Sequence, residues 1–367
     1  MRIFYLFKKE LLEIFRQKEM LAIMFIAPLI QIIVLGYVVT TDVKHIPVEI
    51  VNLSQSNAAS RITYRIQSSP LFDVKKIAYT PDDYLTQFKK GYVKSVIIFR
   101  DKPEKESGPF SVPEIQILMD GVDANSSLIA AGYFNGVIRK YVLDEFKRYG
   151  MELPVENKTV IRFNPDLKSI NYMGPAIVAL LLLIITMFLI SIGLVREKEQ
   201  QTLATLMISR LTPMEIYMGK SIPMALLGLM EMFFGIVVVL LFFKVSLKGN
   251  ILYLLLAALI FLLAVLAYAL LISTVSSTQQ QALFFSWFSM VLFLLLSGLF
   301  TPLENIPKSF RWLADINPLR YFIKIIREIF LKGNGIAYFY RDLLIIAVIT
   351  VVVLLISMFT FKRTVQG

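Results

Sequence analysis

A run of 52 residues without a charged side chain, residues 249–300, constrains the fold of this chain more than any other feature. As a single helix it would be about 78 Å long at ~1.5 Å per residue. The hydrocarbon core of a bilayer is ~30 Å thick, so one crossing cannot contain the run. Serine, threonine and glutamine gather near its centre, at residues 273–281, where a tight turn needs hydrogen-bonding side chains. The run therefore predicts two membrane-spanning helices joined by a turn.

Four further stretches have membrane-spanning length and contain no charged residue or only one. Hydrophobic residues make up 56% of the 367-residue chain, compared with ~45–50% apolar residues in soluble domains. We therefore expect an α-helical polytopic membrane protein with six transmembrane helices. The expected spans are residues 20–41, 173–195, 221–243, 251–272, 282–300 and 343–361.

Basic residues near the spans predict the orientation. Residues 1–19 have apolar side chains at helical spacing with charged side chains between them, which predicts an amphipathic helix in the membrane interface. With the N-terminus inside, the cytoplasmic segments hold eleven Lys and Arg residues and the short external loops hold nine. Five of the eleven precede the first span, which usually dominates orientation. We therefore expect both termini in the cytoplasm.

Residues 42–172 change abruptly to a charged, proline-containing composition that is long enough for one folded domain. Apolar runs and alternation predict strands, and helical spacing with capping residues predicts helices between them. We expect an extracytoplasmic α/β domain inserted between the first two spans. The expected strands are residues 47–53, 95–99, 114–118 and 159–163, and the expected helices are residues 80–90 and 125–149.

The composition excludes several kinds of site. The chain has no cysteine and one histidine, His45, so disulfides, thiolate metal sites and histidine-based zinc sites are not expected. Gly219-Lys220-Ser221 matches the end of a P-loop, but Met214 stands where that motif needs its first glycine. We expect no cofactor in this chain. The 38 Lys and Arg residues against 27 Asp and Glu are distributed around the spans, so nucleic acid is not an expected partner.

Residues 196–220 lie on the expected cytoplasmic side, where a helix leaves the membrane, breaks and restarts. Thr212, Pro213 and Glu215 form a capping box that begins the second helix. A solvated helical hairpin would explain the charges, but it would not explain an exposed apolar stripe, which needs a partner surface. The candidate contact residues are Arg196, Glu197, Lys198, Glu199, Thr202, Leu203, Leu206, Met207 and Leu211.

Glu231 is the single charged residue of residues 221–243 and lies almost at their midpoint. A charge at this depth costs ~2.5–3.5 kcal/mol on insertion scales, and such residues usually face a bundle interior or an aqueous path. Glu231 and Gln31 are therefore candidates for a translocation path. In the alternative, Glu231 hydrogen-bonds to a neighbouring helix near Gln31 and only holds the bundle together.

Four stretches together resemble the membrane subunits of ABC-2 type exporters, in particular drug-export-like permeases with a large external domain. They are residues 27–52, 196–223, 278–282 and 297–333. One departure falls in the second stretch, where Gln201-Thr202-Leu203-Ala204 replaces the family's usual Gly-Thr-x-Glu. The resemblance covers most of the chain outside the middle of the external domain.

The resemblance implies a permease of the bacterial inner membrane that exports a substrate from the cytoplasm or the membrane. It implies ATP hydrolysis by separate ATPase subunits that contact residues 196–220. It also implies pairing with a second permease copy or a paralogue. A periplasmic adaptor is a further candidate partner if cargo crosses a second membrane.

The resemblance further implies short re-entrant helices before the last span, within residues 301–341. Three prolines break this segment, and Asn317 with Pro318 predicts the start of a helix. Arg320, Lys324 and Arg327 are expected at lipid headgroups. Membrane lipids are therefore expected partners.

Two other functions compete with export. A membrane-anchored receptor or scaffold would bind a ligand through the external domain, but it needs only one or two spans. An intramembrane enzyme would need paired intramembrane aspartates, a Gly-x-Ser-x-Gly motif or a histidine within a span, and none of these occurs in the sequence. Six spans favour transport.

Overall fold

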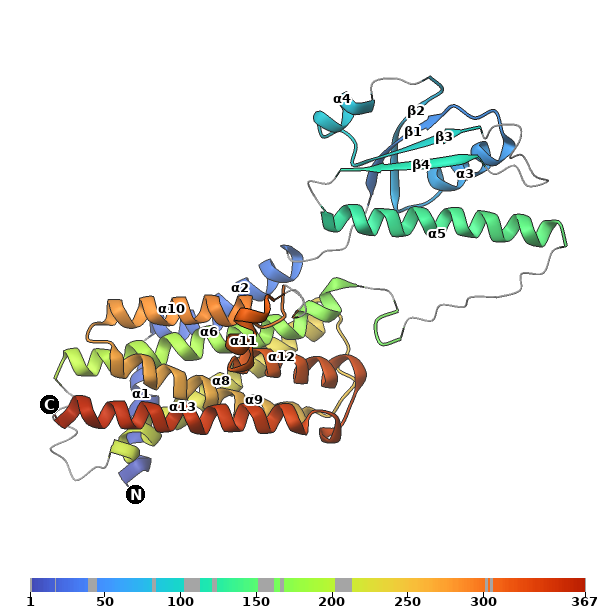
Figure 1. The fold of residues 1–367 in the computed structure, drawn as a ribbon. Helices are drawn as coiled ribbons and strands as arrows, with labels where there is room; N and C mark the ends of the chain where they lie inside the picture. The colour runs from blue at the N-terminus through green and yellow to red at the C-terminus, as the bar shows by residue number, and fades with distance from the viewer. Residues whose placement is uncertain are drawn as a thin grey trace. The chain divides into compact units, whose positions relative to one another are not determined.

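The computed structural model describes residues 2–16, 18–38, 45–80, 84–101, 113–120, 124–150, 162–165, 168–201, 213–300, 303 and 306–366. The chain divides into two compact units (Figure 1). Unit 1 contains Met1–Thr40 and Ile161–Gly367, and unit 2 contains Thr41–Val160. The polypeptide therefore leaves unit 1 once, forms unit 2 and returns to complete unit 1.

Unit 1 is a bundle of long helices (Figure 1). They are α1 (Arg2–Arg16), α2 (Lys18–Val38), α6 (Ser169–Glu199), α8 (Pro213–Phe242), α9 (Ile251–Val275), α10 (Gln279–Leu295) and α13 (Tyr340–Gln366). Shorter elements connect the last two: η3 (Lys308–Phe310), α11 (Arg311–Asp315), α12 (Pro318–Arg327), η4 (Glu328–Lys332) and η5 (Ile336–Tyr338).

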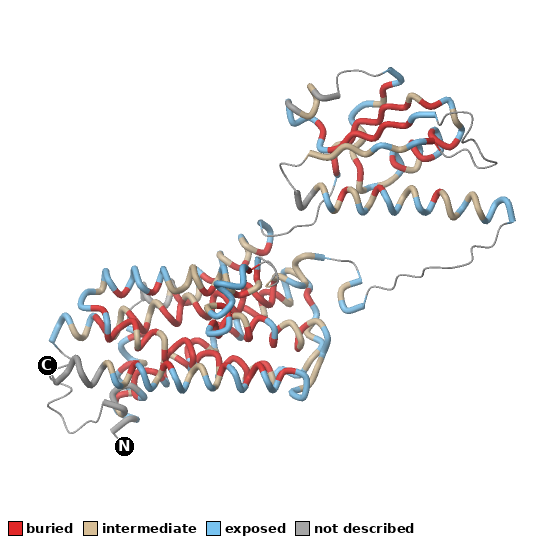
Figure 2. The backbone as a smooth tube through the Cα atoms, viewed as in Figure 1, coloured by how far each residue is buried: buried red, intermediate tan, exposed pale blue. Residues whose placement is uncertain are grey.

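The core of unit 1 lies along α6 and α9. Residues 174–183 of α6 are all buried, and α9 contributes alanines that are fully shielded from solvent, including Ala257, Ala258 and Ala264. Small side chains let helix backbones approach closely, which is how helices associate in a membrane. α13 packs along α9, and α8, α10 and α12 pack against α6. Figure 2 shows the buried positions concentrated where the helices face one another.

Of the described helices, four are long and apolar enough to cross a membrane: Ser169–Glu199, Met218–Phe242, Ile251–Val275 and Tyr340–Thr360. They correspond to four of the six expected spans, and the chain is a mostly helical membrane protein. The other two expected spans correspond to shorter apolar stretches, Met24–Val38 and Gln279–Leu295. Length and hydropathy alone therefore do not confirm the count of six.

Local sequence signals at two turns are confirmed. α9 ends at Val275, and Thr278 accepts a hydrogen bond from the Gln281 N–H at 3.2 Å where α10 begins. The 52-residue uncharged run is therefore two helices, as its polar centre predicts. Asn317 accepts a hydrogen bond from the Leu319 N–H at 3.0 Å and begins α12 with Pro318 in its first turn.

Unit 2 contains a four-stranded sheet in the order β2-β1-β3-β4. Its elements are β1 (Ile46–Asn52), α3 (Asn57–Gln67), β2 (Phe72–Ala78), α4 (Tyr84–Lys89), β3 (Ser95–Arg100), β4 (Glu114–Met119) and α5 (Ala124–Arg148). β1 is parallel to β2 and β3, and β4 is antiparallel to β3, with Ile97 opposite Ile117. α3 and α5 contribute to the apolar cluster on one face, and Phe88 of α4 packs on the other.

Three predicted strands and two predicted helices of unit 2 agree with β1, β3, β4, α4 and α5 to within a few residues. The sequence analysis did not assign α3 or β2. The strand expected at residues 159–163 falls mostly outside the described residues, and Arg162 and Phe163 are not in a strand. The left-handed φ of 71° at Phe163 is incompatible with a regular strand there.

Candidate functional site: the charged junction at the end of α6

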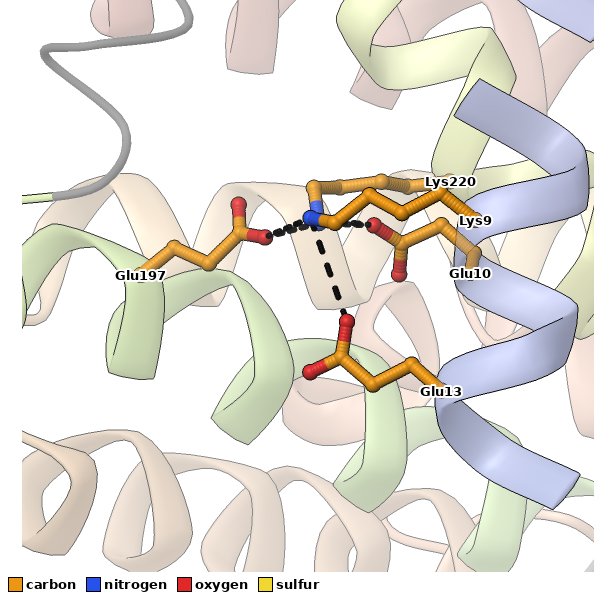
Figure 3. A network of polar contacts seen from close by, with 5 residues as sticks. All are labelled: Lys9, Glu10, Glu13, Glu197 and Lys220. Carbon is orange, nitrogen blue, oxygen red and sulfur yellow. Dashed lines mark hydrogen bonds and ion pairs between the residues drawn. The ribbon is translucent and has the colours of Figure 1, made fainter. Parts of the chain in front are cut away.

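Lys220 of α8 lies between two carboxylates that come from different helices (Figure 3). Its Nζ donates to Glu197 Oε1 of α6 at 2.6 Å and to Glu10 Oε1 of α1 at 2.8 Å. All three side chains are largely buried. Lys9 Nζ adds ion pairs at 3.6 Å to Glu10 and 3.7 Å to Glu197. Lys9 also lies 3.8 Å from the exposed Glu13. Two cations and three carboxylates therefore share one site, and the pairing reduces the electrostatic cost of burying Glu10, Glu197 and Lys220.

Gly219 explains how α1 comes close enough to α8 for this contact. A Cβ at position 219 would lie 2.4 Å from Cδ2 of Leu6 and 2.8 Å from its Cγ. Only glycine leaves room for the Leu6 side chain at this crossing. Leu6 and Ile14 are buried on the same face of α1 as Glu10, which places the carboxylate against Lys220. Gly219-Lys220 thus has a packing and pairing role.

Lys198 and Glu199 extend these contacts to the α9–α10 turn. Lys198 Nζ donates to the Ser276 carbonyl at 3.0 Å, at the C-terminal end of α9. Glu199 Oε1 accepts from the Gln279 N–H at 2.9 Å, at the first residue of α10. A cation therefore faces the negative end of one helix dipole and an anion faces the positive end of the next. Consecutive residues of α6 hold both ends of the turn.

We refer to these residues together as the charged junction. It comprises Lys9, Glu10, Glu197, Lys198, Glu199 and Lys220. The junction joins α1, α6, α8 and the α9–α10 turn at one end of the bundle. Beside it, a cavity of about 260 Å³ is bounded by junction residues and by apolar side chains that include Ile14, Leu194 and Met224. The arrangement links these helices to one another through buried and partly buried polar contacts.

The family model for ABC-2 family transporter proteins matches residues 18–359, which is most of the chain. The chain belongs to the ABC-2 transporter family. The resemblance found in the sequence is therefore confirmed.

Curated relatives in this family match the chain over most of its length. The probable multidrug ABC transporter permease YbhR of Escherichia coli is 26% identical over 351 residues, which are 95% of each chain. The inner membrane transport permease YhhJ of the same organism is 23% identical over 99% of this chain and 97% of its own. The ABC transporter G family member 20 of Dictyostelium discoideum is 23% identical over 90% of this chain, which corresponds to 46% of that longer protein.

In this ABC-2 protein, the predicted contact residues of α6 have different surroundings. Glu197, Lys198 and Glu199 contribute to the charged junction, whereas Arg196 is exposed. The sequence analysis expected these side chains to contact a partner, and the structure shows that three of them contact other helices of the same chain. The other candidates lie outside the described residues: Thr202, Leu203, Leu206, Met207 and Leu211.

Glu231 lies inside the apolar bundle of this ABC-2 protein and is 4% exposed. Neither carboxyl oxygen has a hydrogen-bond partner among the described residues, so the structure shows no bond to Gln31. α2 and α8 nevertheless pack together, which places both residues on contacting helices. An unsatisfied buried carboxyl costs free energy. A role of Glu231 and Gln31 in transport stays a prediction.

Glu10, Lys9 and Lys220 were not among the predicted site residues. A signal for Glu10 was present, because it follows Leu6 and precedes Ile14 by four residues each and so shares their helix face. A carboxylate on a buried face is rare unless it is paired. The identity of its partner, 210 positions away, could not be found without the packing of α1 on α8.

Proposed function

We propose that this chain is the membrane-spanning subunit of an ATP-driven exporter and that a separate ATPase subunit drives it through residues 202–212. Family membership and the names of the E. coli relatives support a role as a transporter permease. The position of the charged junction carries the proposal, because Glu197 and Lys220 lie on either side of residues 202–212 and bind each other.

The junction gives a physical route from the docking segment to the bundle. A displacement of residues 202–212 moves the end of α6, the start of α8, or both. The ion pairs of Glu197 and Lys220 then carry the displacement to α1, and the contacts of Lys198 and Glu199 carry it to the α9–α10 turn. The apolar residues Leu203 and Leu206 within the segment supply the surface that the ATPase binds.

The junction also supports six crossings. It gathers Glu10 just before α2, the end of α6, the start of α8 and the turn after α9 at one end of the bundle. α2, α8 and α10 begin at this end of the bundle, whereas α6 and α9 end there. Consecutive helices must therefore run through the bundle in alternating directions. α2 has 21 residues and α10 has 17, and transmembrane helices have ~17–25. We therefore infer that α2 and α10 cross as well, with unit 2 outside and both termini in the cytoplasm.

The assembly follows from the same reasoning. The ATPase is a second polypeptide in this proposal, and the transporter contains this chain twice or once with a paralogue. The longer Dictyostelium relative has about half its length outside the match, which leaves room for further transporter parts in one polypeptide. The bacterial inner membrane is the proposed location. The family as a whole supports transport over a receptor or scaffold role.

The proposal is tested with the purified chain and its ATPase reconstituted in vesicles. The wild-type chain is expected to change the ATPase's hydrolysis rate. Combining Glu10→Gln, Glu197→Gln and Lys220→Met removes both buried carboxylates together with their cation, and this variant is expected to remove the rate change while binding persists. Arg61→Gln is a matched control, because the Arg61–Glu145 pair joins α3 and α5 within unit 2. If the junction variant changed the ATPase's hydrolysis rate as much as the wild-type chain does, the proposed route would be wrong.

A further inference from the structure

A second cavity lies at the other end of unit 1 from the charged junction. It has a volume of about 610 Å³ and is bounded by the start of α6, the segment after α10, α12 and the start of α13. Ligand cavities typically have volumes of ~300–1,000 Å³. We call it the α12 cavity. Four basic side chains border it: Arg320, Lys324, Arg327 and Lys332.

Three of these four cations are paired with carboxylates. Arg320 pairs with Asp315, Lys332 pairs with Glu328, and Lys324 Nζ lies 2.9 Å from Asp342 Oδ2. Arg327 has no carboxylate partner among the residues that the structure describes. Within the described part of the chain, no neighbouring side chain therefore compensates the charge of this guanidinium.

Arg327 is held in a fixed position. Its guanidinium carbon lies 3.5 Å from the centre of the Tyr172 ring. Nε donates to the Tyr172 carbonyl at 3.4 Å, and Nη1 donates to the Gly298 carbonyl at 3.3 Å. Nη2 is buried and has no hydrogen-bond acceptor in the described part of the chain. Leaving a buried donor of a charged group unpaired is costly. Nη2 therefore remains to donate to an anionic oxygen, and hydrogen bonds from a guanidinium to phosphate are strong.

The amphipathic character of α12 places these cations at one side of the helix. Phe322, Ile325 and Ile326 are buried in the bundle core, whereas Arg320, Lys324 and Arg327 follow at intervals of four and three residues and form one stripe. Apolar residues, including Leu299, Leu303 and Leu331, also border the cavity. The cavity thus combines a cationic group with an apolar wall, at the end of the apolar helices where lipid headgroups lie.

We propose that the α12 cavity binds one anionic membrane lipid, with the headgroup phosphate on Arg327 and the acyl chains along the apolar wall. The phosphate oxygens accept from the guanidinium and compensate its charge. The Tyr172 ring keeps the guanidinium plane oriented. This site is separate from the charged junction and does not depend on how ATP hydrolysis is coupled.

Native mass spectrometry of the full purified chain in detergent tests this proposal. The probes are phosphatidylglycerol, phosphatidylcholine and inorganic phosphate, each titrated separately and then in competition. The wild-type chain is expected to retain one phosphatidylglycerol and to bind phosphatidylcholine more weakly. Arg327→Gln is expected to weaken phosphatidylglycerol binding roughly tenfold or more, because hydrogen bonds to charged groups are lost.

Arg341→Gln is the matched control. Arg341 also lies over a tyrosine ring, that of Tyr340, but it is exposed and does not border the cavity. Leu331→Trp leaves Arg327 in place and fills the apolar part of the cavity, so it gives a second measurement if Arg327→Gln does not fold. It is also expected to weaken phosphatidylglycerol binding.

Three results would overturn the proposal. The first is that Arg327→Gln binds phosphatidylglycerol as well as the wild-type chain does. If Arg327→Gln does not fold, the same result for Leu331→Trp counts instead. The second is an equal loss in Arg341→Gln. The third is displacement of phosphatidylglycerol by millimolar inorganic phosphate, which would assign the site to the free ion. Selective phosphatidylglycerol retention that depends on Arg327 would support it.

Discussion

Lys220 Nζ lies 2.6 Å from Glu197 Oε1, and these two residues flank residues 202–212 in the sequence. The pair ties the end of α6 to the start of α8 at the base of the segment proposed to bind the ATPase. Because Lys220 also binds Glu10 at 2.8 Å, the N-terminal helix α1 is part of the same contact. Glu197, Lys198 and Glu199 at the end of α6 therefore have a structural role within the chain, in addition to any contact with a partner.

Lys220→Met should strongly destabilise the bundle. The change leaves Glu10 and Glu197 largely buried without their cation, and removing one partner of a buried ion pair costs about 3–5 kcal/mol. The melting temperature of the purified protein should fall. Adding Glu10→Gln should restore part of the loss, which a double-mutant cycle measures. Additive losses would contradict a direct interaction.

Replacing Leu203 and Leu206 together with Asp should uncouple ATP hydrolysis from transport, because charges replace the apolar surface proposed for ATPase docking. Membrane insertion and expression should be unchanged. The measurements are transport and hydrolysis in the same vesicles. Leu128→Asp is the control, since Leu128 is an exposed leucine of α5 in unit 2. Normal transport by the double variant would refute the docking assignment.

Cysteine labelling should reveal the proposed topology, because the chain has no native cysteine. An impermeant thiol reagent added from outside should label Ser107→Cys and should not label Ser209→Cys. After permeabilisation both should be labelled. Labelling of Ser209→Cys but not of Ser107→Cys in intact cells would show that the chain has the opposite orientation.

Glu231→Gln should reduce transport or change its pH dependence while expression and ATPase binding are preserved. Glutamine keeps the shape of the side chain and removes the ionisable carboxyl, so it separates a role in transport from a role in packing. Glu114→Gln, at an exposed carboxylate of β4 in unit 2, is the control. Transport equal to wild type at every pH would leave Glu231 as a structural residue.

Acid should weaken unit 2 through Asp101. The Ser54 hydroxyl and the Gln55 N–H donate hydrogen bonds that hold the pKa of Asp101 below its ordinary value. This contribution is fully present above the unfolded-state pKa of about 3.9 and is lost as pH falls through the lower folded-state value. The measurement is the rate of backbone hydrogen exchange in β1 and β3, corrected for the intrinsic pH dependence of exchange. Below about pH 4 this rate should rise less in Asp101→Asn than in the wild-type chain, because asparagine has no carboxyl group to protonate. An identical acid response would contradict the assignment.

The part of the fold that could be predicted rests on local signals. Uncharged runs mark the long helices because burying backbone in lipid requires helical hydrogen bonding. The polar centre of residues 249–300 marks the α9–α10 turn, and Asn317-Pro318 marks the start of α12. β2 was missed because Phe72–Ala78 contains Asp73, Lys75 and Lys76 and does not alternate strictly. Strand assignment from sequence depends on that alternation.

The sequence by itself determined the family, the apolar helices and the absence of a P-loop, because hydropathy, capping and motif spacing are properties of short segments. Only the tertiary structure decided that Lys220 binds Glu10 and Glu197 and that Arg327 lies over Tyr172. Pairs such as these depend on where helices cross, and a crossing is set by packing details such as the close approach of Leu6 to Gly219. No local pattern encodes the partner of a side chain 210 residues away.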